Sequence, residues 1–486
     1  MTSLGRLVDA CLMPGFAGAN LPDWASRALD DGLAGIALYG ANLADGSAVE
    51  RLSAAIHARR EDALVALDEE GGDVTRLDYR TGSRYPGNLA LGVLDDRDAT
   101  TSVAQAMAGD LRRAGVDVDL APSVDVNSDP DNPVIGVRSF GADPSLVARH
   151  GSAFVRGLQA GGVAAVAKHF PGHGATSADS HHSEPVVADD ERTIRERDLP
   201  PFVAAIASGV LGVMTGHVLM PAFDDLPATL SRRLITGLLR DELGFEGAVV
   251  TDALDMAGVR HRYGIAGSAV LALAAGADLL LIGAEDGERH RHDVHRAVAR
   301  AVGDGDLTRS RLEDAARRVR SLLQPRGAEP PAGSAVDIGA DVAWRSTSVV
   351  GALPEIRSTV VVELRGTTSL AVGDARWSLA HPMRELHALA DSVQVTSDGP
   401  SAEAVVDAAR SRPLVLAVRD AYRSDWQRAW VAALLQHRPD AILVCLGMPQ
   451  DAGLGAATSV LAHGAGRANT DAAARRLTGR HGPRPA

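Results

Sequence analysis

The sequence predicts a TIM-like (β/α)8 barrel followed by a smaller α/β domain, and three observations lead to this fold class. In the first two thirds of the chain, eight short apolar runs are separated mostly by amphipathic stretches. A segment rich in Pro, Gly and Ala follows, and beyond it further apolar runs alternate with helix-like segments. No Gly-rich dinucleotide-binding motif follows an early run, which counts against a doubly wound sheet in the first part.

The eight apolar runs are the predicted barrel strands, because a parallel strand buried on both faces gives a continuous apolar segment. They lie at residues 10–13, 35–38, 63–67, 116–120, 163–167, 211–214, 248–250 and 278–282. Amphipathic stretches predict helices between them, among others at 47–60, 104–114 and 234–243. Asp143 and Pro144 predict an N-cap followed by proline in the first helical position.

The Pro-, Gly- and Ala-rich linker at 324–336 sets the predicted domain limits. We expect the catalytic barrel over 1–323, the α/β domain over 337–478 and a frayed tail over 479–486. In the second domain, strands are predicted at 359–364, 413–418 and 441–446, and helices at 401–410 and 426–435.

The composition of the 486-residue chain is that of a soluble globular protein. The net charge of −13 argues against nucleic acid or an anionic membrane as the main partner. The two cysteines, Cys11 and Cys445, are too few for a disulfide framework and permit a reducing compartment. The first residues lack the pattern of a secretory signal, and no apolar stretch has the length of a membrane span. We therefore expect a cytoplasmic protein, whose oligomeric state stays open.

Polar residues lie at the ends of several predicted strands, where the active site of such a barrel forms. They are Asp68, Lys168, His169, His217 and Asp252. Any one of them could simply bind its own loop, but five at the same end of the strands predict a functional site. Lys168 is the only lysine among the 49 Lys and Arg residues, so this position favours a compact ammonium group over a guanidinium.

The fifth predicted strand leads into a long segment, KHFPGHGATSADSHHSEP, which has neither helical nor strand periodicity. A loop of this length is typical of a functional lid or of disorder. Asp179 precedes His181 by two positions, so its carboxylate could orient the imidazole and favour its charged form, as a general acid/base requires. Alternatively, the four histidines 169, 173, 181 and 182 could bind zinc, although Pro171 and Gly172 break the helical spacing usual for such ligands.

The motifs together resemble glycoside hydrolase family 3, and within it the β-N-acetylglucosaminidase (NagZ-type) branch. The resemblance rests on KHFPGHG, the following D-S-H and TDALDM. It extends over about residues 10–285 through MPGF, LDEEGG, APSVDVN, NPVIGVRSFGADP, PATLS and GLLRDELGF. The C-terminal part is similar to the second domain of the family only loosely, through VCLGMP and GAGRAN.

The resemblance implies a retaining, exo-acting enzyme that removes terminal β-linked N-acetylglucosamine from cell-wall, muropeptide or chitooligosaccharide fragments. Asp252 then corresponds to the nucleophile that forms a covalent glycosyl-enzyme. His181 corresponds to the acid/base on a mobile loop, and Asp179 to its partner in a dyad. Retaining glycosidases commonly use two carboxyl groups for these roles, so here an imidazole replaces one of them.

The resemblance also implies a set of substrate-binding residues, namely Asp68, Arg76, Arg138, Lys168 and His169. It implies neither a cofactor nor a metal, and the expected partner is a small carbohydrate. The chain departs from the family at Asp73, where many relatives carry a basic or amide residue. With five Trp, five Tyr and seven Phe, an extended aromatic platform is not expected, and a small pocket for one terminal sugar fits exo action better.

Other functions stay open from the residues alone. A β-glucosidase or β-xylosidase of the same family usually takes its acid/base carboxylate from the second domain, whereas the Asp-x-His motif favours the acetamido-sugar branch. A neutral imidazole does not repel phosphate, so an N-acetylglucosaminide phosphorylase is a further alternative. A metal-dependent barrel hydrolase and a carbohydrate-binding barrel without catalysis complete the set.

Overall fold

The computed structural model describes residues 2–176, 185–324, 335–366, 372 and 378–483. The chain forms two compact units that are interleaved along the sequence. The barrel unit comprises Met1–Glu70, Thr100–Ile135 and Gly141–Ala332, and the α/β unit comprises Gly71–Ala99, Gly136–Phe140 and Gly333–Ala486. Within the described ranges, no helix is long and apolar enough to cross a membrane.

All eight predicted barrel strands form. They are β1 (Leu12–Pro14), β2 (Gly35–Ala37), β3 (Leu64–Leu67), β4 (Val118–Asp119), β5 (Ala164–Phe170), β6 (Gly212–Thr215), β7 (Ala248–Thr251) and β8 (Leu280–Ile282). Strands β2 to β7 make a parallel six-stranded sheet in chain order, and β1 pairs in parallel with β8. The backbone N–H of Thr251 donates to the carbonyl oxygen of Leu279, and that of Ala34 to Asp9, which joins the two sheets.

A single apolar cluster contains side chains from or beside all eight strands, which shows that the strands surround one core. Its members are Met13, Ala34, Ala37, Leu64, Ala66, Val118, Leu120, Ala164, Val166, Met214, Ala248, Val250, Leu279, Leu281, Val319 and Leu322. Alternate residues of each strand point inward, as the pleat requires. The predicted (β/α)8 barrel is therefore confirmed.

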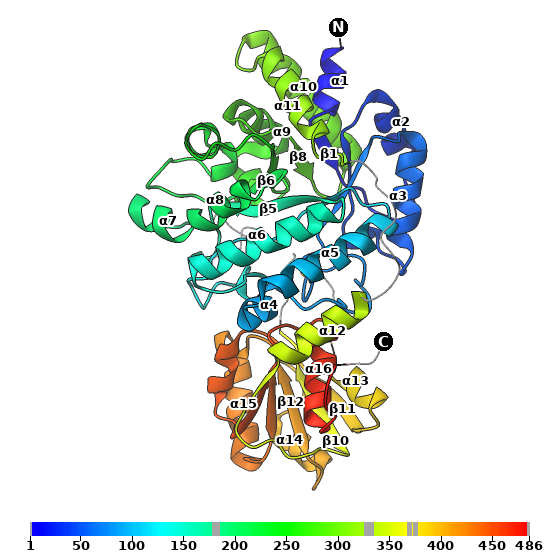
Figure 1. Cartoon of the computed structure of the whole chain (residues 1–486), viewed down its shortest axis with the longest axis vertical. Helices are drawn as coiled ribbons and strands as arrows, with labels where there is room; N and C mark the ends of the chain where they lie inside the picture. The colour runs from blue at the N-terminus through cyan, green and yellow to red at the C-terminus, as the bar shows by residue number, and fades with distance from the viewer. Residues whose placement is uncertain (1, 177–184, 325–334, 367–371, 373–377, 484–486) are drawn as a thin grey trace. The chain divides into compact units, whose positions relative to one another are not determined.

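Helices enclose these strands (Figure 1). They are α1 (Leu4–Asp9), α2 (Asp23–Asp31), α3 (Ala48–Arg59), α5 (Arg97–Arg113), α6 (Pro144–Ala160), α7 (Glu191–Arg197), α8 (Leu199–Ala207), η4 (Arg233–Glu242), α9 (Ala257–Ala275), α10 (Gly287–Asp304) and α11 (Arg309–Arg320). Helix α6 begins as predicted, because the Asp143 side chain accepts a hydrogen bond from the N–H of Ser145 and Pro144 follows the cap.

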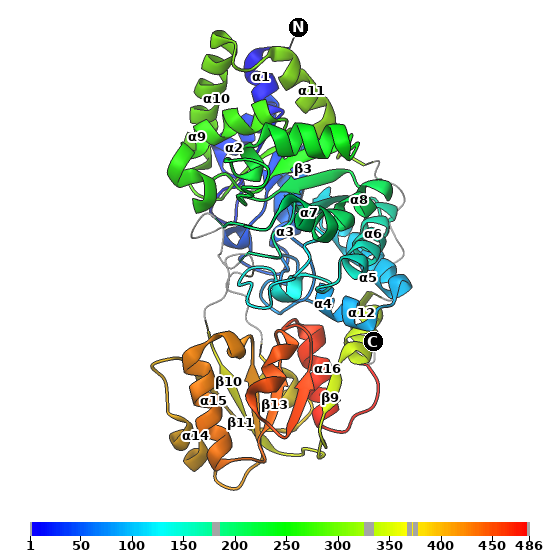
Figure 2. The same ribbon diagram turned by 90° about the vertical axis from the view of Figure 1, so that its left-hand side faces the viewer.

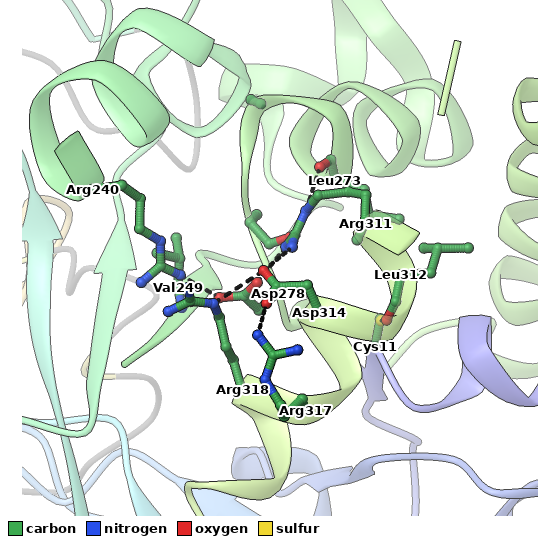
Figure 3. A network of polar contacts seen from close by, with 12 residues as sticks. Cys11, Arg240, Val249, Leu273, Asp278, Arg311, Leu312, Asp314, Arg317 and Arg318 are labelled. Carbon is green, nitrogen blue, oxygen red and sulfur yellow. Dashed lines mark hydrogen bonds and ion pairs between the residues drawn. The ribbon is translucent and has the colours of Figure 1, made fainter. Parts of the chain in front are cut away.

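The amino end of β8 is anchored by the buried carboxylate of Asp278 (Figure 3). Its Oδ2 atom accepts hydrogen bonds from Arg240, at 2.5 Å, and from the backbone N–H of Val249, at 2.9 Å. Arg311 binds the other oxygen. Burial raises the pKa of Asp278, although the two guanidinium groups oppose this, and burial lowers the pKa of Arg240 to about 10. This network ties η4 and α11 to the strands at the end opposite to the expected active site.

The α/β unit contains a six-stranded sheet in the order β11-β10-β12-β13-β14-β9, parallel except for β9. The strands are β9 (Ser348–Val350), β10 (Thr359–Leu364), β11 (Leu389–Val395), β12 (Leu414–Val418), β13 (Ile442–Cys445) and β14 (Thr458–Leu461). The helices are α4 (Asn88–Leu94), α12 (Ala335–Ser346), α13 (Ala380–Glu385), α14 (Ala402–Ala409), α15 (Asp425–His437) and α16 (Arg467–Leu477). Short helical turns η1, η2, η3, η5 and η6 lie at Gly40–Asn42, Gly136–Arg138, Ala228–Leu230, Ala421–Arg423 and Pro449–Leu454 in the two units.

Each face of this sheet packs against its own helices. Helices α14 and α15 lie on one face and α13 and α16 on the other, and Figure 2 shows α15 and α16 on opposite sides. Successive residues of β12 alternate between the two apolar clusters, since Val415 joins one and Leu416 the other. A sheet buried on both faces is the reason why β10, β12 and β13 appear in the sequence as continuous apolar runs.

The sequence did not predict β9, β11 and β14. Strand β11 is largely exposed at the edge of the sheet and carries Asp391, Ser392 and Gln394, so it lacks an apolar run. Strand β9 is also an edge strand and is exposed at two of its three residues. The predicted linker at 324–336 lies almost entirely outside the described residues, and the domain limits stay predictions.

Candidate active site

Charged side chains meet at the carboxyl ends of β3 and β5. The Lys168 ammonium group, which is 1% exposed, lies 2.7 Å from Oδ1 of Asp68 and 2.7 Å from Oε1 of Glu70. Lys168 belongs to β5 itself, because this strand continues to Phe170, beyond the predicted end. Lys168 and Glu70 are buried and Asp68 is partly exposed, and the cation between two carboxylates offsets the cost of burying these charges. The structure thus brings together two of the predicted substrate-binding residues, Asp68 and Lys168.

His169 follows Lys168, and its ring forms a hydrogen bond with a buried aspartate. Its Nδ1 atom lies 2.7 Å from Oδ2 of Asp125, whose side chain is fully buried. Asp125 reaches this place because residues after β4 run alongside β5, with the N–H of Val124 donating to the carbonyl oxygen of Lys168. Burial alone would raise the pKa of Asp125, but the neighbouring His169 holds it well below its usual range.

His173 lies beside this pair, and its ring meets that of His169 edge to face at 5.9 Å between centroids. Its Nδ1 atom is 2.7 Å from Oγ1 of Thr176. Burial, followed by the neighbouring His169, lowers the pKa of His173 to about 4, while Asp125 and Asp252 act in the opposite direction. His173 is therefore a neutral imidazole at physiological pH, within electrostatic reach of Asp252.

Asp252 directly follows β7 and is half-buried. Its backbone N–H donates to Thr215 in β6, and its Oδ1 atom accepts from the N–H of Ala253 at 2.8 Å. His217, which follows the preceding strand β6, supports the same loop, because its Nε2 atom donates to the carbonyl oxygen of Ala253 at 2.9 Å. His217 is fully buried, so it contributes to the placement of the loop that carries Asp252.

Arg76 and Arg138 belong to the α/β unit, whereas the other described candidates belong to the barrel unit. Both are buried, and the carbonyl oxygen of Arg138 accepts a hydrogen bond from the side-chain amide of Asn88 at 2.6 Å. Asp73, the departure from the family pattern, forms an ion pair with Arg419 at 2.6 Å and accepts from the N–H of Ala465 at 2.7 Å. Asp73 is thus a structural contact inside the α/β unit.

The predicted dyad Asp179 and His181 lies outside the described residues, as does His182. Among the residues that the structure describes, no group of three or more His, Cys, Asp or Glu side chains is arranged to hold a metal ion. The Nδ1 atoms of His169 and His173 both face protein oxygens, on Asp125 and Thr176 respectively.

Sequence reasoning missed three buried carboxylates at this end of the barrel. Asp125 and Glu70 contact His169 and Lys168, and Asp119 accepts the backbone N–H of Glu69 at 2.9 Å. Burial and the charge of Glu69 raise the pKa of Asp119 well above its usual range. The sequence did carry a sign of two of these carboxylates. Asp119 interrupts the apolar run of β4, and Asp125 interrupts the apolar residues that follow this strand.

The family model described as the N-terminal domain of glycosyl hydrolase family 3 matches residues 22–322, which is more than half of the chain. The chain belongs to glycosyl hydrolase family 3. Asp68, Lys168, His169 and Asp252, which lie at the carboxyl ends of its barrel strands, all fall within the matched range. As a member of glycosyl hydrolase family 3, the chain is a glycoside hydrolase by family.

Known proteins similar to this family 3 chain include two curated enzymes and one solved structure. The beta-hexosaminidase A of Pseudoalteromonas piscicida is 34% identical over 318 residues, covering 60% of this chain and 53% of that enzyme, so the chain spans about half its length. The beta-hexosaminidase of Nitrosomonas eutropha is 37% identical over 280 residues, covering 56% and 80%. A family 3 beta-N-acetylglucosaminidase from Paenibacillus sp. str. FPU-7 has a TM-score of 0.89 and 31% identity, covering 99% of this chain and 98% of that one.

Proposed function

We propose that this chain is a retaining, exo-acting β-N-acetylglucosaminidase that removes terminal β-linked N-acetylglucosamine. The names of the similar enzymes support the substrate class. The observation that carries the proposal is the half-buried Asp252 carboxylate at the end of β7. It lies within electrostatic reach of His173, in the segment that follows β5.

In the proposed first step, an Asp252 oxygen attacks the anomeric carbon and the glycosidic bond breaks. His181, charged with the help of Asp179, gives its proton to the departing oxygen, and a covalent glycosyl-enzyme results. In the second step, neutral His181 takes a proton from water, whose oxygen attacks the same carbon and releases Asp252. The configuration at the anomeric carbon is retained because it is inverted twice.

The proposed binding residues suit a polyhydroxylated ligand. Asp68 can accept hydrogen bonds from sugar hydroxyls while Lys168 donates to them, and their own contact keeps both in place. His169 adds an imidazole beside Lys168. Arg76 and Arg138, which belong to the α/β unit, are proposed as further substrate-binding residues. Hydrogen bonds to charged groups are worth about 1.5–3 kcal/mol each, enough to favour the correct sugar strongly.

A comparison of two chromogenic substrates tests the substrate class. We expect 4-nitrophenyl N-acetyl-β-glucosaminide to be hydrolysed with a kcat/KM at least about 100-fold above that of the β-glucoside, since a site built for a polar substituent rejects the analogue lacking it. NMR of the first product formed should show the β-anomer. Preference for the glucoside or a first α-anomer would refute the proposal, and formation of a sugar 1-phosphate on adding phosphate would reassign the enzyme as a phosphorylase.

The nucleophile is tested with Asp252→Asn and a matched control, Asp241→Asn, at an exposed position of η4. We expect Asp252→Asn to lower kcat by about 10⁴-fold or more, the scale for loss of a covalent catalyst, and Asp241→Asn to leave it unchanged. A mechanism-based fluoro-sugar should label the peptide that contains Asp252 in the unchanged protein. Labelling of another carboxylate would remove Asp252 from this role.

The proposed biological substrates are muropeptides or chitooligosaccharides, and we propose a cytoplasmic role in peptidoglycan turnover. The release of free N-acetylglucosamine from chitobiose is compared with its release from a purified disaccharide-peptide, and we expect the kcat/KM values to differ. A several-fold higher kcat/KM for the disaccharide-peptide is expected if peptidoglycan fragments are the substrate. The opposite order would assign the enzyme to chitin fragments instead.

A further inference from the structure

The carboxylate of Asp125 is fully buried, and donors occupy both of its oxygens. Oδ1 accepts the backbone N–H groups of His169, at 3.2 Å, and His173, at 2.7 Å. Oδ2 accepts the Ser123 hydroxyl at 2.9 Å and lies 2.7 Å from Nδ1 of His169. One side chain thus fixes both the backbone and a ring of the KHFPGH segment.

The charge state of Asp125 determines which ring atom of His169 carries hydrogen. Burial alone would raise the pKa of Asp125, but His169, through both its ring and its backbone N–H, holds it well below its usual range, so the group is ionised. An ionised carboxylate can only accept hydrogen bonds, hence Nδ1 of His169 must donate. In the described part of the chain no contact is found for Nε2 of His169, and the side chain keeps 7% exposure. Nε2 is therefore the ring atom left for a ligand.

We propose that Asp125 is a positioning residue, which fixes His169 in the form protonated on Nδ1 and thereby presents Nε2 to the sugar. This inference rests on the proposed function and adds to it a residue that does not itself touch the substrate. A carboxylate that orients an imidazole in this way sets its tautomer and its direction together. Loss of the carboxylate should therefore act on the substrate through His169.

Asp125→Asn is the informative variant because it keeps the size of the side chain. An amide placed with its NH2 group toward His169 would become a donor, which forces Nδ1 to accept and moves the ring hydrogen to Nε2. Ser123→Ala is the matched control, since it removes one donor to the same oxygen and leaves the contact between Asp125 and His169 in place.

Two measurements test the inference. The first is ¹⁵N NMR of histidine-labelled protein, in which the His169 signal is assigned by its loss in His169→Gln. His169 should carry hydrogen on Nδ1 in the wild-type enzyme and in Ser123→Ala. In Asp125→Asn it should carry hydrogen on Nε2 alone. In a double-mutant cycle on kcat/KM, Asp125→Asn should lower the value about 100-fold, and the Asp125→Asn/His169→Gln protein should match His169→Gln within about threefold.

Hydrogen on Nε2 alone in the wild-type enzyme would overturn the inference. Additive effects of the two substitutions on kcat/KM would also overturn it, because Asp125 would then act by a route other than His169. If Asp125→Asn does not fold, the ring signals of the wild-type enzyme and of Ser123→Ala still show which nitrogen of His169 carries hydrogen. The tautomer measurement needs no turnover. Absence of acetamido-sugar hydrolysis by the unchanged enzyme would therefore refute the proposed function without being confused with failure of this inference.

Discussion

The Nζ atom of Lys168 lies 2.7 Å from Oδ1 of Asp68, across 100 positions of the sequence. The same ammonium group contacts Glu70 at 2.7 Å, and this glutamate is buried as deeply as the lysine. Because the Lys168 side chain is 1% exposed, its charge depends on these carboxylates rather than on water.

Lys168→Met should destabilise the protein by about 3–5 kcal/mol, because it leaves a buried carboxylate without its cation. The double variant Lys168→Met/Glu70→Gln should recover part of this loss, since it removes the unpaired buried charge. Urea unfolding followed by circular dichroism measures both. A loss below about 1 kcal/mol for the single variant, the value typical of an exposed pair, would contradict the ion-pair role.

Asp278→Asn should destabilise the barrel unit by about 3–5 kcal/mol, because Arg240 and Arg311 would face a neutral amide in a buried site (Figure 3). The network lies at the amino end of β8, away from Asp252, so KM for the chromogenic substrate should stay the same. Thermal unfolding and steady-state kinetics check the two halves of this prediction. A changed KM with unaltered stability is the result that would count against it.

His463 gives the α/β unit a sensitivity to acid. Burial lowers the pKa of His463 to about 4, and neither ring nitrogen has a hydrogen-bond partner in the described structure. In the unfolded chain the pKa is about 6.5, so the unfolded state binds more protons between these values. The stability that His463 contributes as a neutral group is complete above pH 6.5 and is lost as the pH falls toward 4.

His463→Asn should remove this sensitivity, because asparagine does not titrate and tolerates the backbone φ of +56° found here. Between pH 7 and pH 5 we expect the unchanged protein to lose about 2 kcal/mol more than the variant, following the linkage relation. Urea unfolding at both pH values gives the comparison. His173 titrates in the same window in both proteins, so equal losses would show that His463 contributes nothing.

Gly157 in α6 lies against α5 at a distance that only glycine allows. A Cβ atom at this position would meet the carbonyl oxygen of Thr101 at 2.5 Å, so the helices would have to move apart. Gly157→Ala should cost about 1–3 kcal/mol, the usual range for overpacking. Gly267→Ala in α9, where nothing lies within 4 Å, is the control and should stabilise by up to about 1 kcal/mol. Equal melting temperatures would contradict the close contact.

The strands that the sequence predicted share one property, burial on both faces. This is why β3, β5 and β12 were visible as apolar runs, whereas the exposed edge strand β11 was not. The strand ends also located Asp68, Lys168, His169 and Asp252, because topology alone places these ends on one side of the barrel.

Contacts between distant segments could not be predicted in the same way. Asp125 follows β4, and only the path of residues 122–125 beside β5 brings it to His169. In the sequence, Asp73 stands out only as a departure from the family pattern, whereas in the structure it binds Arg419, which lies far along the chain. The assignment of Arg76 and Arg138 to the α/β unit follows from such long-range packing, of which the local sequence carries no sign.

Because the two units are interleaved along the sequence, the barrel unit cannot be isolated by a single truncation of the chain. Ending the chain after residue 332 would keep residues 71–99 and 136–140 but delete the elements on which they pack. Asp73 would lose Arg419 and Ala465, and Leu89 and Val137 would lose Met448. A truncated barrel made from this sequence would therefore expose the apolar side chains of residues 71–99 and 136–140. We expect it to aggregate unless both segments are redesigned.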